Sequence, residues 1–214
     1  MIKIYGRPDS SAVARVMWTI GELGLDYERV DWGGAYGGND SLEYRAMNPS
    51  GKIPAVQLEN GQTLWESNAI IRYLCATDAS YHFLPVDPLE RAKIEAWMEW
   101  AGALQSAVSR IRKAYKLEGA KPSDIDAELE QVAPILRVLN TQLAGRNFVM
   151  GHDISAADFA LGVWAHRLWR CPPVAKPQGM DAIWNWIERL QSRPAYREHV
   201  MEKVSAGPQN VGGG

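Results

Sequence analysis

The sequence lacks several features that would each define a class of protein. It has only two cysteines, Cys75 and Cys171, which lie far apart and do not have the spacing of metal ligands, so we expect neither a disulfide framework nor a metal site. It has no apolar run long enough to cross a membrane, and its first residues lack the apolar core of a signal peptide. We therefore expect a cytoplasmic protein with a reducing environment and no membrane partner.

An excess of either charge is also missing. Lysine and arginine number 23 against 25 aspartate and glutamate residues, which gives a net charge of −2 and a pI near 6.1. No basic field is available to hold nucleic acid or an anionic membrane surface. Hydrophobic residues make up 46% of the 214 residues, as in an ordinary globular protein. The composition therefore predicts a soluble globular chain without a nucleic-acid partner.

The first 78 residues change their hydrophobic period repeatedly. The spacing predicts a strand at 2–5, a helix at 11–23, a strand at 27–32, a short helix at 41–47, two strands at 53–58 and 62–65, and a helix at 67–77. Asn60-Gly61 between the last two strands is a strong hairpin signal. The order strand–helix–strand, helix, hairpin, helix is that of a thioredoxin-like α/β domain with a mixed sheet.

The rest of the chain is predicted to be helical. Residues 79–87 are polar and are predicted to form a linker, and Asp87-Pro88 is a typical helix start. Residues 88–214 show helical spacing of apolar side chains, including many of the nine tryptophans. The predicted domains are thus 1–78, thioredoxin-like, and 88–214, an all-α helical bundle.

Three local patterns in the first domain can carry chemistry. Ser10 and Ser11 follow Pro8 at a strand-to-helix junction, where a helix N-terminus favours an anion and a hydroxyl can donate to a thiolate. The alternative is that either serine only caps the helix. A cis bond between Ile53 and Pro54 would turn the backbone of Ile53 outward, toward an extended peptide; the alternative is a plain edge proline.

The third pattern is Glu66-Ser67 at the start of the last helix of this domain. A serine hydroxyl at a helix N-terminus can receive a carboxylate, and a glutamate can receive an ammonium, so the pair suits an amino-acid head group. Simple capping by Ser67 is the alternative interpretation.

These patterns together resemble the glutathione transferase superfamily, especially its bacterial members. The resemblance rests on the Pro-x-Ser loop with Arg15-Val16, on 48–54 (Asn-Pro-Ser-Gly-Lys-Ile-Pro) and on 66–70 (Glu-Ser-Asn-Ala-Ile). In the second domain, 151–158 resembles the family's helix-capping segment, in which Ser155 and Asp158 form a capping box. The resemblance extends over residues 1 to about 203 and implies glutathione as co-substrate.

The resemblance also implies roles for individual residues. Ser10 falls where several classes place the serine that donates to the glutathione sulfur, and Lys52 where a side chain contacts the tripeptide. Ile53, next to Pro54, would pair with the cysteinyl unit, while Glu66 and Ser67 would hold the γ-glutamyl end. Some bacterial relatives use an asparagine two residues after the serine, but this chain has Ala12 there, and position 10 is not cysteine. These departures favour a serine-type enzyme.

As the resemblance implies, the thiolate would attack a small hydrophobic electrophile held by the helical domain, as in detoxification, and the chain would form a homodimer. The candidate pocket residues, which serve equally well as core, are Trp97, Trp100, Ala101, Leu104 and Trp164. Glutathione-dependent isomerisation, or reduction of disulfides or peroxides, would use the same thiolate. The fold also occurs as a non-catalytic interaction module, which glutathione-agarose retention would distinguish from an enzyme.

Overall fold

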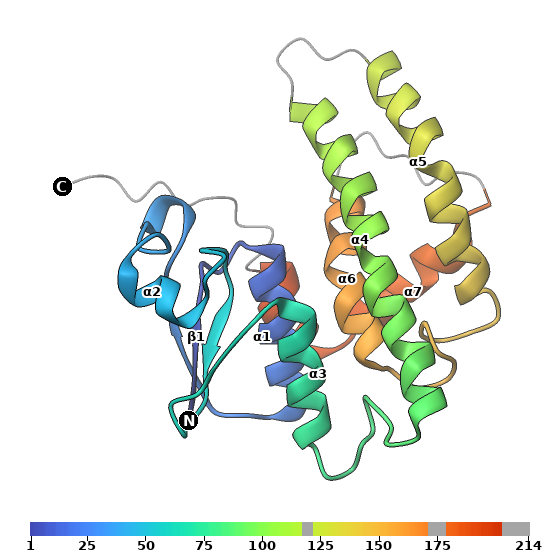
Figure 1. Ribbon diagram of the computed structural model, residues 1–214. Helices are drawn as coiled ribbons and strands as arrows, with labels where there is room; N and C mark the ends of the chain where they lie inside the picture. Colours follow the sequence, from blue (N-terminus) through green and yellow to red (C-terminus); the bar gives the residue numbers. More distant parts are fainter. Residues whose placement is uncertain (117–121, 171–178, 203–214) are drawn as a thin grey trace. The chain divides into compact units, whose positions relative to one another are not determined.

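The computed structural model describes residues 1–116, 122–170 and 179–202, and for 115–116 and 122–125 it describes the backbone alone. Contacts in this part of the chain divide it into two compact units (Figure 1). The sheet unit contains residues 1–82 and the segment from Pro194, and the helical unit contains residues 83–193. The predicted second domain, 88–214, includes Cys171 and residues 203–214, which lie outside the described residues.

The sheet unit has the predicted thioredoxin-like arrangement. Its elements are β1 (Ile2–Tyr5), α1 (Ser11–Leu23), β2 (Tyr27–Val30), the 3-10 helix η1 (Gly34–Tyr36), α2 (Leu42–Met47), β3 (Ala55–Gln57), β4 (Thr63–Trp65) and α3 (Ser67–Thr77). The four strands lie in the order β2-β1-β3-β4, with β1 parallel to β2 and the other two pairs antiparallel. Helices α1 and α3 pack together on one face, and α2 lies on the other side (Figure 1).

Local sequence explains the ends of these elements. Ser10 caps α1, and Gly24 ends it in the left-handed conformation at φ 63°, which glycine adopts without strain. The strand β3 begins only at Ala55, because Pro54 has no N–H to give to the sheet. The Asn60-Gly61 turn closes the predicted hairpin, with the Leu58 N–H donating to the Gln62 carbonyl over 2.8 Å.

The C-terminal segment packs in the sheet unit, whereas the sequence pattern grouped it with the helices of the second domain. Helix α8 (Pro194–Tyr196) and the π-helical turn η2 (Arg197–Glu202) both contact α1. Tyr196 is fully buried and meets the indole of Trp18 edge-on, with 4.7 Å between ring centroids. Sequence spacing showed that this segment is helical, but it could not show which domain provides the apolar surface that covers it.

The helical unit consists of α4 (Pro88–Lys116), α5 (Pro122–Leu143), α6 (Ala156–Trp169) and α7 (Asp181–Gln191). Helix α4 contacts α5 and α6, and α7 contacts the same two helices. The Asp87 carboxylate caps α4, as predicted, by accepting from the N–H groups of Leu89 and Glu90. No helix within 1–116, 122–170 and 179–202 is both long and apolar enough to span a lipid bilayer.

Part of the predicted linker 79–87 belongs to the helical unit, which begins at Phe83. Phe83 and Leu84 are buried in the helical unit, and the Phe83 ring meets Phe159 of α6 edge-on at 5.2 Å. The Phe83 carbonyl also accepts from the N–H of Ala156, the first residue of α6, over 2.9 Å. The interpretation of 79–87 as a polar linker overlooked Phe83 and Leu84, which are apolar.

A buried carboxylate fixes the start of α6. Asp158 has no exposed surface, and its oxygens accept from the Ser155 N–H at 2.9 Å, as the predicted capping box requires. They also accept from the Ser155 hydroxyl, the Val149 N–H and the Trp186 indole N–H of α7. Burial raises the pKa of Asp158, and the hydrogen bonds act against that rise. The carboxylate therefore joins three segments of the helical unit.

Candidate active site

Ser10 lies between β1 and α1, at the position where the helix N-terminus exposes its N–H groups. Its side chain is 8% exposed, and its oxygen accepts from the Val13 N–H at 3.5 Å. The structure thus confirms that Ser10 caps the helix. A hydroxyl that accepts still has a proton to donate, and that proton has no acceptor among the described residues. Capping and donation to a ligand are therefore compatible at Ser10.

The neighbouring residues differ from Ser10 in their position. Ser11 is the first residue of α1 and is also 8% exposed, but it is not the cap. Arg7, just before the turn, pairs with Asp9 at 2.9 Å, and its side chain lies against Gly34. A Cβ on Gly34 would approach the Arg7 guanidinium to 3.1 Å, and Gly34 has φ 63°, a backbone conformation that glycine adopts without strain.

The segment 52–54 forms the second part of the site. The Ile53–Pro54 bond is cis, which is the first of the two alternatives that the sequence left open. Lys52 is exposed, Ile53 is half-buried and Pro54 is buried, and all three lie just before β3 at its pairing with β1. The Lys52 carbonyl accepts two hydrogen bonds, from the Tyr44 hydroxyl and from the Asn48 amide. Side chains of α2 and of its C-terminal cap therefore fix this segment by hydrogen bonds to its backbone.

Glu66 and Ser67 form the third part, and the structure corrects the predicted cap. Helix α3 begins at Ser67, and Glu66 takes the N-cap position without a side-chain capping bond. Glu66 has φ 66°, a conformation that non-glycine residues rarely adopt and that often marks functional sites. Ser67 is buried, whereas Glu66 is exposed. The carboxylate and the hydroxyl therefore lie at the positive end of α3.

Arg15 is a site residue to which the sequence analysis gave no role. It lies on α1, is 6% exposed, and its guanidinium donates to the Ser67 hydroxyl at 2.6 Å and to the Asn68 amide oxygen at 3.1 Å. Burial lowers the pKa of Arg15 to about 10, and the charge of Glu66 opposes this shift, so Arg15 remains a cation at neutral pH. The Arg15-Val16 pattern was the available signal, but apolar spacing alone could not show where the side chain points.

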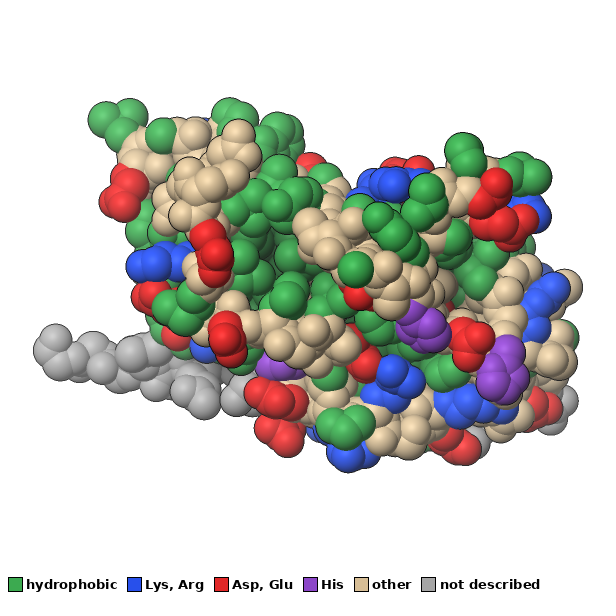
Figure 2. All heavy atoms as spheres, turned by 90° about the horizontal axis from the view of Figure 1, so that it is seen from below, with side chains coloured by type: hydrophobic (Ala, Val, Ile, Leu, Met, Phe, Trp, Pro, Cys, Tyr) green, Lys and Arg blue, Asp and Glu red, His purple; other side chains and the backbone are tan. Residues whose placement is uncertain are grey.

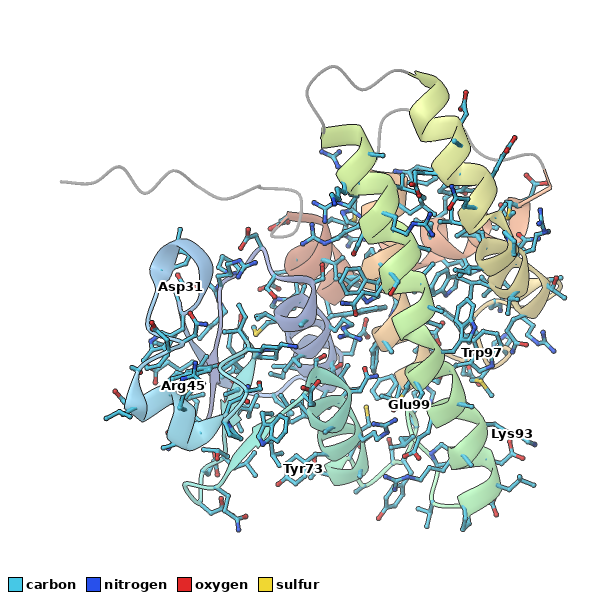
Figure 3. All side chains as sticks on the ribbon, turned by 45° about the horizontal axis from the view of Figure 1, so that its top comes forward. Asp31, Arg45, Tyr73, Lys93, Trp97 and Glu99 are labelled. Atoms are coloured by element: carbon cyan, nitrogen blue, oxygen red, sulfur yellow. The ribbon has the colours of Figure 1, made fainter. Side chains whose placement is uncertain are left out.

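The structure places the five candidate pocket residues of the helical unit in two environments. Ala101, Leu104 and Trp164 are buried at 1%, 0% and 8% exposure, whereas Trp97 and Trp100 are half-exposed and meet edge-on at 5.3 Å. Trp97 projects from α4 on the side of α5 (Figure 3), where it lines an open groove of about 590 Å³. The other lining residues of this groove are Arg137, Val138, Thr141, Gln142 and Arg146. Trp97 therefore lines a groove that the buried residues Ala101, Leu104 and Trp164 do not line.

A second groove, of about 470 Å³, lies in the sheet unit away from Ser10. Met1, Leu25 and Tyr73 contribute exposed apolar surface to it, and Asp26 and Glu59 contribute charge. Figure 2 views the molecule from below Figure 1, and on this face hydrophobic side chains lie among acidic ones. The Met1 ammonium forms an ion pair with Glu59 there. None of the residues predicted to bind a ligand belongs to this groove.

The arrangement around α1 and α3 suits an anionic, peptide-like ligand. It offers two helix N-termini, a hydroxyl with an available proton, and a carboxylate that can accept an ammonium group. Across the described residues no group of three or more histidine, cysteine, aspartate or glutamate side chains is placed to hold a metal ion. The two helix N-termini and the side chains beside them can give hydrogen bonds and charge stabilisation to a ligand.

Comparison with known proteins gives a consistent result. The glutathione S-transferase N-terminal domain family matches residues 1–76, and the glutathione S-transferase C-terminal domain family matches residues 122–189. Glutathione S-transferase GstB of Escherichia coli K12 is 32% identical over 210 residues, which cover 96% of this chain and 100% of the relative. Glutathione S-transferase 3 of Zea mays is 29% identical over 212 residues, with 93% of each chain covered.

A solved structure agrees with these relatives. The theta class glutathione S-transferase from Xanthomonas axonopodis pv. citri, with glutathione bound, has a TM-score of 0.82 and 33% identity, with 95% of this chain and 98% of that chain covered. Fold, site and comparisons define a two-domain transferase with a thioredoxin-like first domain. The chain belongs to the glutathione S-transferase family and is an enzyme of that class.

Proposed function

We propose that this enzyme binds glutathione in the sheet unit, ionises its thiol at Ser10, and transfers the glutathionyl group to a small hydrophobic electrophile. The observation that carries the proposal is the Ser10 hydroxyl, whose oxygen caps α1 while its proton has no acceptor among the described residues. A thiolate placed at this hydroxyl would receive both a hydrogen bond and the favourable field of the helix N-terminus.

The magnitudes support a thiolate at neutral pH. An ordinary thiol has a pKa of about 8.5, so only a few per cent is ionised at pH 7. A hydrogen bond to a charged group contributes about 1.5–3 kcal/mol, and the helix terminus adds up to about 1 kcal/mol. Since one pKa unit corresponds to about 1.4 kcal/mol, these interactions together lower the thiol pKa by roughly two units.

The rest of the tripeptide would lie along the other two parts of the site. We assign the γ-glutamyl carboxylate to Ser67 and the N-terminus of α3, and its ammonium to Glu66. The exposed Lys52 is available to the tripeptide backbone, and Ile53 next to Pro54 would pair with the cysteinyl unit. The positive φ of Glu66 and the buried Arg15 behind Ser67 support this assignment, because both fix the start of α3.

The electrophile is assigned to the helical unit. The aromatic and apolar character of Trp97, Trp100, Ala101, Leu104 and Trp164 supports a hydrophobic substrate, as in detoxification in the cytoplasm. A screen of chlorinated, epoxide, enone and disulfide substrates would separate conjugation from isomerisation and reduction. Activity with disulfides or peroxides alone would replace transfer to a carbon electrophile as the main reaction.

A homodimer is part of the proposal. Trp65 and Tyr73 of the sheet unit are 40% and 39% exposed, and large exposed apolar side chains support a further packing partner. Light scattering at micromolar concentration should give twice the chain mass of 23.8 kDa. A stable species of 23.8 kDa under these conditions contradicts the dimer.

The central test is the ionisation of bound glutathione. Retention on glutathione-agarose establishes binding, and a pH titration of the thiolate ultraviolet absorbance in the complex gives the pKa. We expect a value about two units below that of free glutathione. Binding with an unshifted pKa would remove the proposed role of Ser10 while leaving the glutathione site intact.

A further inference from the structure

The carbonyl oxygen of Lys52 accepts from two buried side chains that come from the same side. The Tyr44 hydroxyl donates to it at 2.7 Å and the Asn48 amide nitrogen at 2.6 Å. Tyr44 lies on α2 and is 0% exposed, and Asn48 is the C-terminal cap of α2 and is 2% exposed. Two short hydrogen bonds from one helix fix the direction of this carbonyl toward α2.

The direction of that carbonyl determines the direction of the next N–H group. The Lys52–Ile53 peptide is trans, and in a trans peptide the C=O and the following N–H point in opposite directions within one plane. Because the Lys52 oxygen points toward α2, the Ile53 N–H points away from α2. Ile53 lies outside the sheet ladder, and its N–H has no acceptor among the described residues.

Other contacts keep this peptide plane from rotating. The Asn48 side-chain oxygen accepts from the Ser50 N–H at 3.0 Å and from the Ser50 hydroxyl at 2.7 Å, so its amide nitrogen faces Lys52. The Ile53 side chain lies against Gly33, where an added Cβ would come within 3.1 Å of it. On α2, Arg45 (labelled in Figure 3) donates to the Pro49 carbonyl at 3.4 Å.

We propose that Tyr44 and Asn48 are positioning residues, which hold the Lys52–Ile53 peptide so that the Ile53 N–H donates to a backbone carbonyl of bound glutathione. The inference rests on the proposed glutathione site and names the residues that prepare one of its donors. A preset donor does not lose conformational freedom when the ligand binds, so its hydrogen bond contributes more to affinity. Burial raises the pKa of Tyr44 to about 12, so its hydroxyl remains a donor throughout the working pH range.

The experiment is isothermal titration calorimetry of glutathione with the full-length chain and two variants. Tyr44→Phe removes one of the two donors and keeps the ring, so the Kd should rise about 3- to 10-fold. Tyr196→Phe is the matched control, because Tyr196 is equally buried in the sheet unit but packs on Trp18 of α1. The control should bind glutathione like the natural chain, even where its unfolding temperature falls.

A double-mutant cycle separates positioning from a general loss of stability. The second ligand is a glutathione analogue with a thiocarbonyl, a weaker acceptor, in place of the cysteinyl carbonyl. The natural chain should prefer glutathione to this analogue, and Tyr44→Phe should reduce that preference by the same factor by which it weakens glutathione binding. An unchanged preference in Tyr44→Phe overturns the positioning role.

Amide hydrogen exchange in the natural chain supplies a test without substitution. The Ile53 N–H should exchange rapidly in the free protein and at least about tenfold more slowly when glutathione is bound. Rapid exchange in both states overturns the inference even though glutathione binds. If the natural chain shows no heat of binding and no retention on glutathione-agarose, the proposed function itself fails, which is a different outcome.

Discussion

The guanidinium of Arg15 donates to the hydroxyl of Ser67 across 2.6 Å, and this bond joins the helix that begins after Ser10 to the helix that begins at Ser67. Both groups are buried, so the bond is shielded from solvent. The Ser67 hydroxyl accepts from Arg15 and therefore directs its own proton elsewhere. One side chain thus connects the two helix N-termini to which we assign the sulfur and the γ-glutamyl end of glutathione.

Arg15→Leu should weaken glutathione binding more than it slows the chemical step. The substitution removes both bonds that fix Ser67 and Asn68, so KM for glutathione should rise about tenfold with a smaller change in kcat. Steady-state kinetics at saturating electrophile measures both constants. Arg29→Leu is a suitable control, since Arg29 lies on the edge strand β2 of the same unit and forms an ion pair with Asp31 at 2.8 Å. Equal KM values for glutathione in Arg15→Leu and Arg29→Leu would contradict the proposed role of Arg15 in positioning Ser67.

Ser10→Ala should raise the pKa of bound glutathione and lower conjugation about ten- to a hundredfold, with a modest change in glutathione affinity. Without the hydroxyl, the thiolate loses a charge-assisted hydrogen bond, so the pH–rate profile should move to higher pH. Ser11→Ala is the matched variant and should have a smaller effect, because Ser11 is the first helical residue and not the cap. A severe defect in Ser11→Ala with normal Ser10→Ala would mean that the sulfur is assigned to the wrong serine.

Asp158→Ala should destabilise the protein and leave the chemistry of the sulfur unchanged. The sequence alone indicated one arm of a capping box, but the structure shows four donors converging on this buried carboxylate. Leaving these donors buried without an acceptor should lower the free energy of unfolding by about 3–5 kcal/mol. Denaturant unfolding measures the change, and Asp153→Ala, at an exposed carboxylate, is the control. Unchanged stability with lost turnover would place Asp158 in the reaction.

His166 should make the protein less stable in weak acid. Burial, followed by the charges of Arg170 and Arg167, lowers the pKa of His166 from 6.5 to about 4. Between these values the unfolded state binds more protons than the folded state, so stability decreases as the pH falls from 6.5 toward 4. The contribution is up to about 1.4 kcal/mol per pH unit.

His166→Gln should flatten this dependence in urea unfolding measured at several pH values. His152→Gln is the control, because the His152 side chain is 86% exposed. Identical slopes for the natural chain and His166→Gln would show that His166 does not titrate differently in the two states.

Much of the fold could be predicted from local sequence. The helices at 11–23 and 67–77 begin and end where apolar spacing, Gly24 and the flanking turns placed them, and Asn60-Gly61 produced the hairpin. These features depend on backbone preferences that act over a few residues. A serine at the start of a predicted helix can also be recognised in the sequence, and this pattern predicted Ser10 and Ser67 as site residues.

Local sequence therefore accounts for the main helices and strands, their order, and the residue types at the helix N-termini. Three contacts could be seen only in the folded chain. Arg15 donates to Ser67, and Tyr44 and Asn48 both donate to the Lys52 carbonyl. The Tyr196 ring packs on Trp18 of α1. The first and last of these contacts join separate helices, whereas Tyr44 and Asn48 reach the loop that precedes β3. The spacing of apolar residues along the chain predicts which face of a helix is buried. It does not predict which element covers that face, because packing depends on how all the elements fit together.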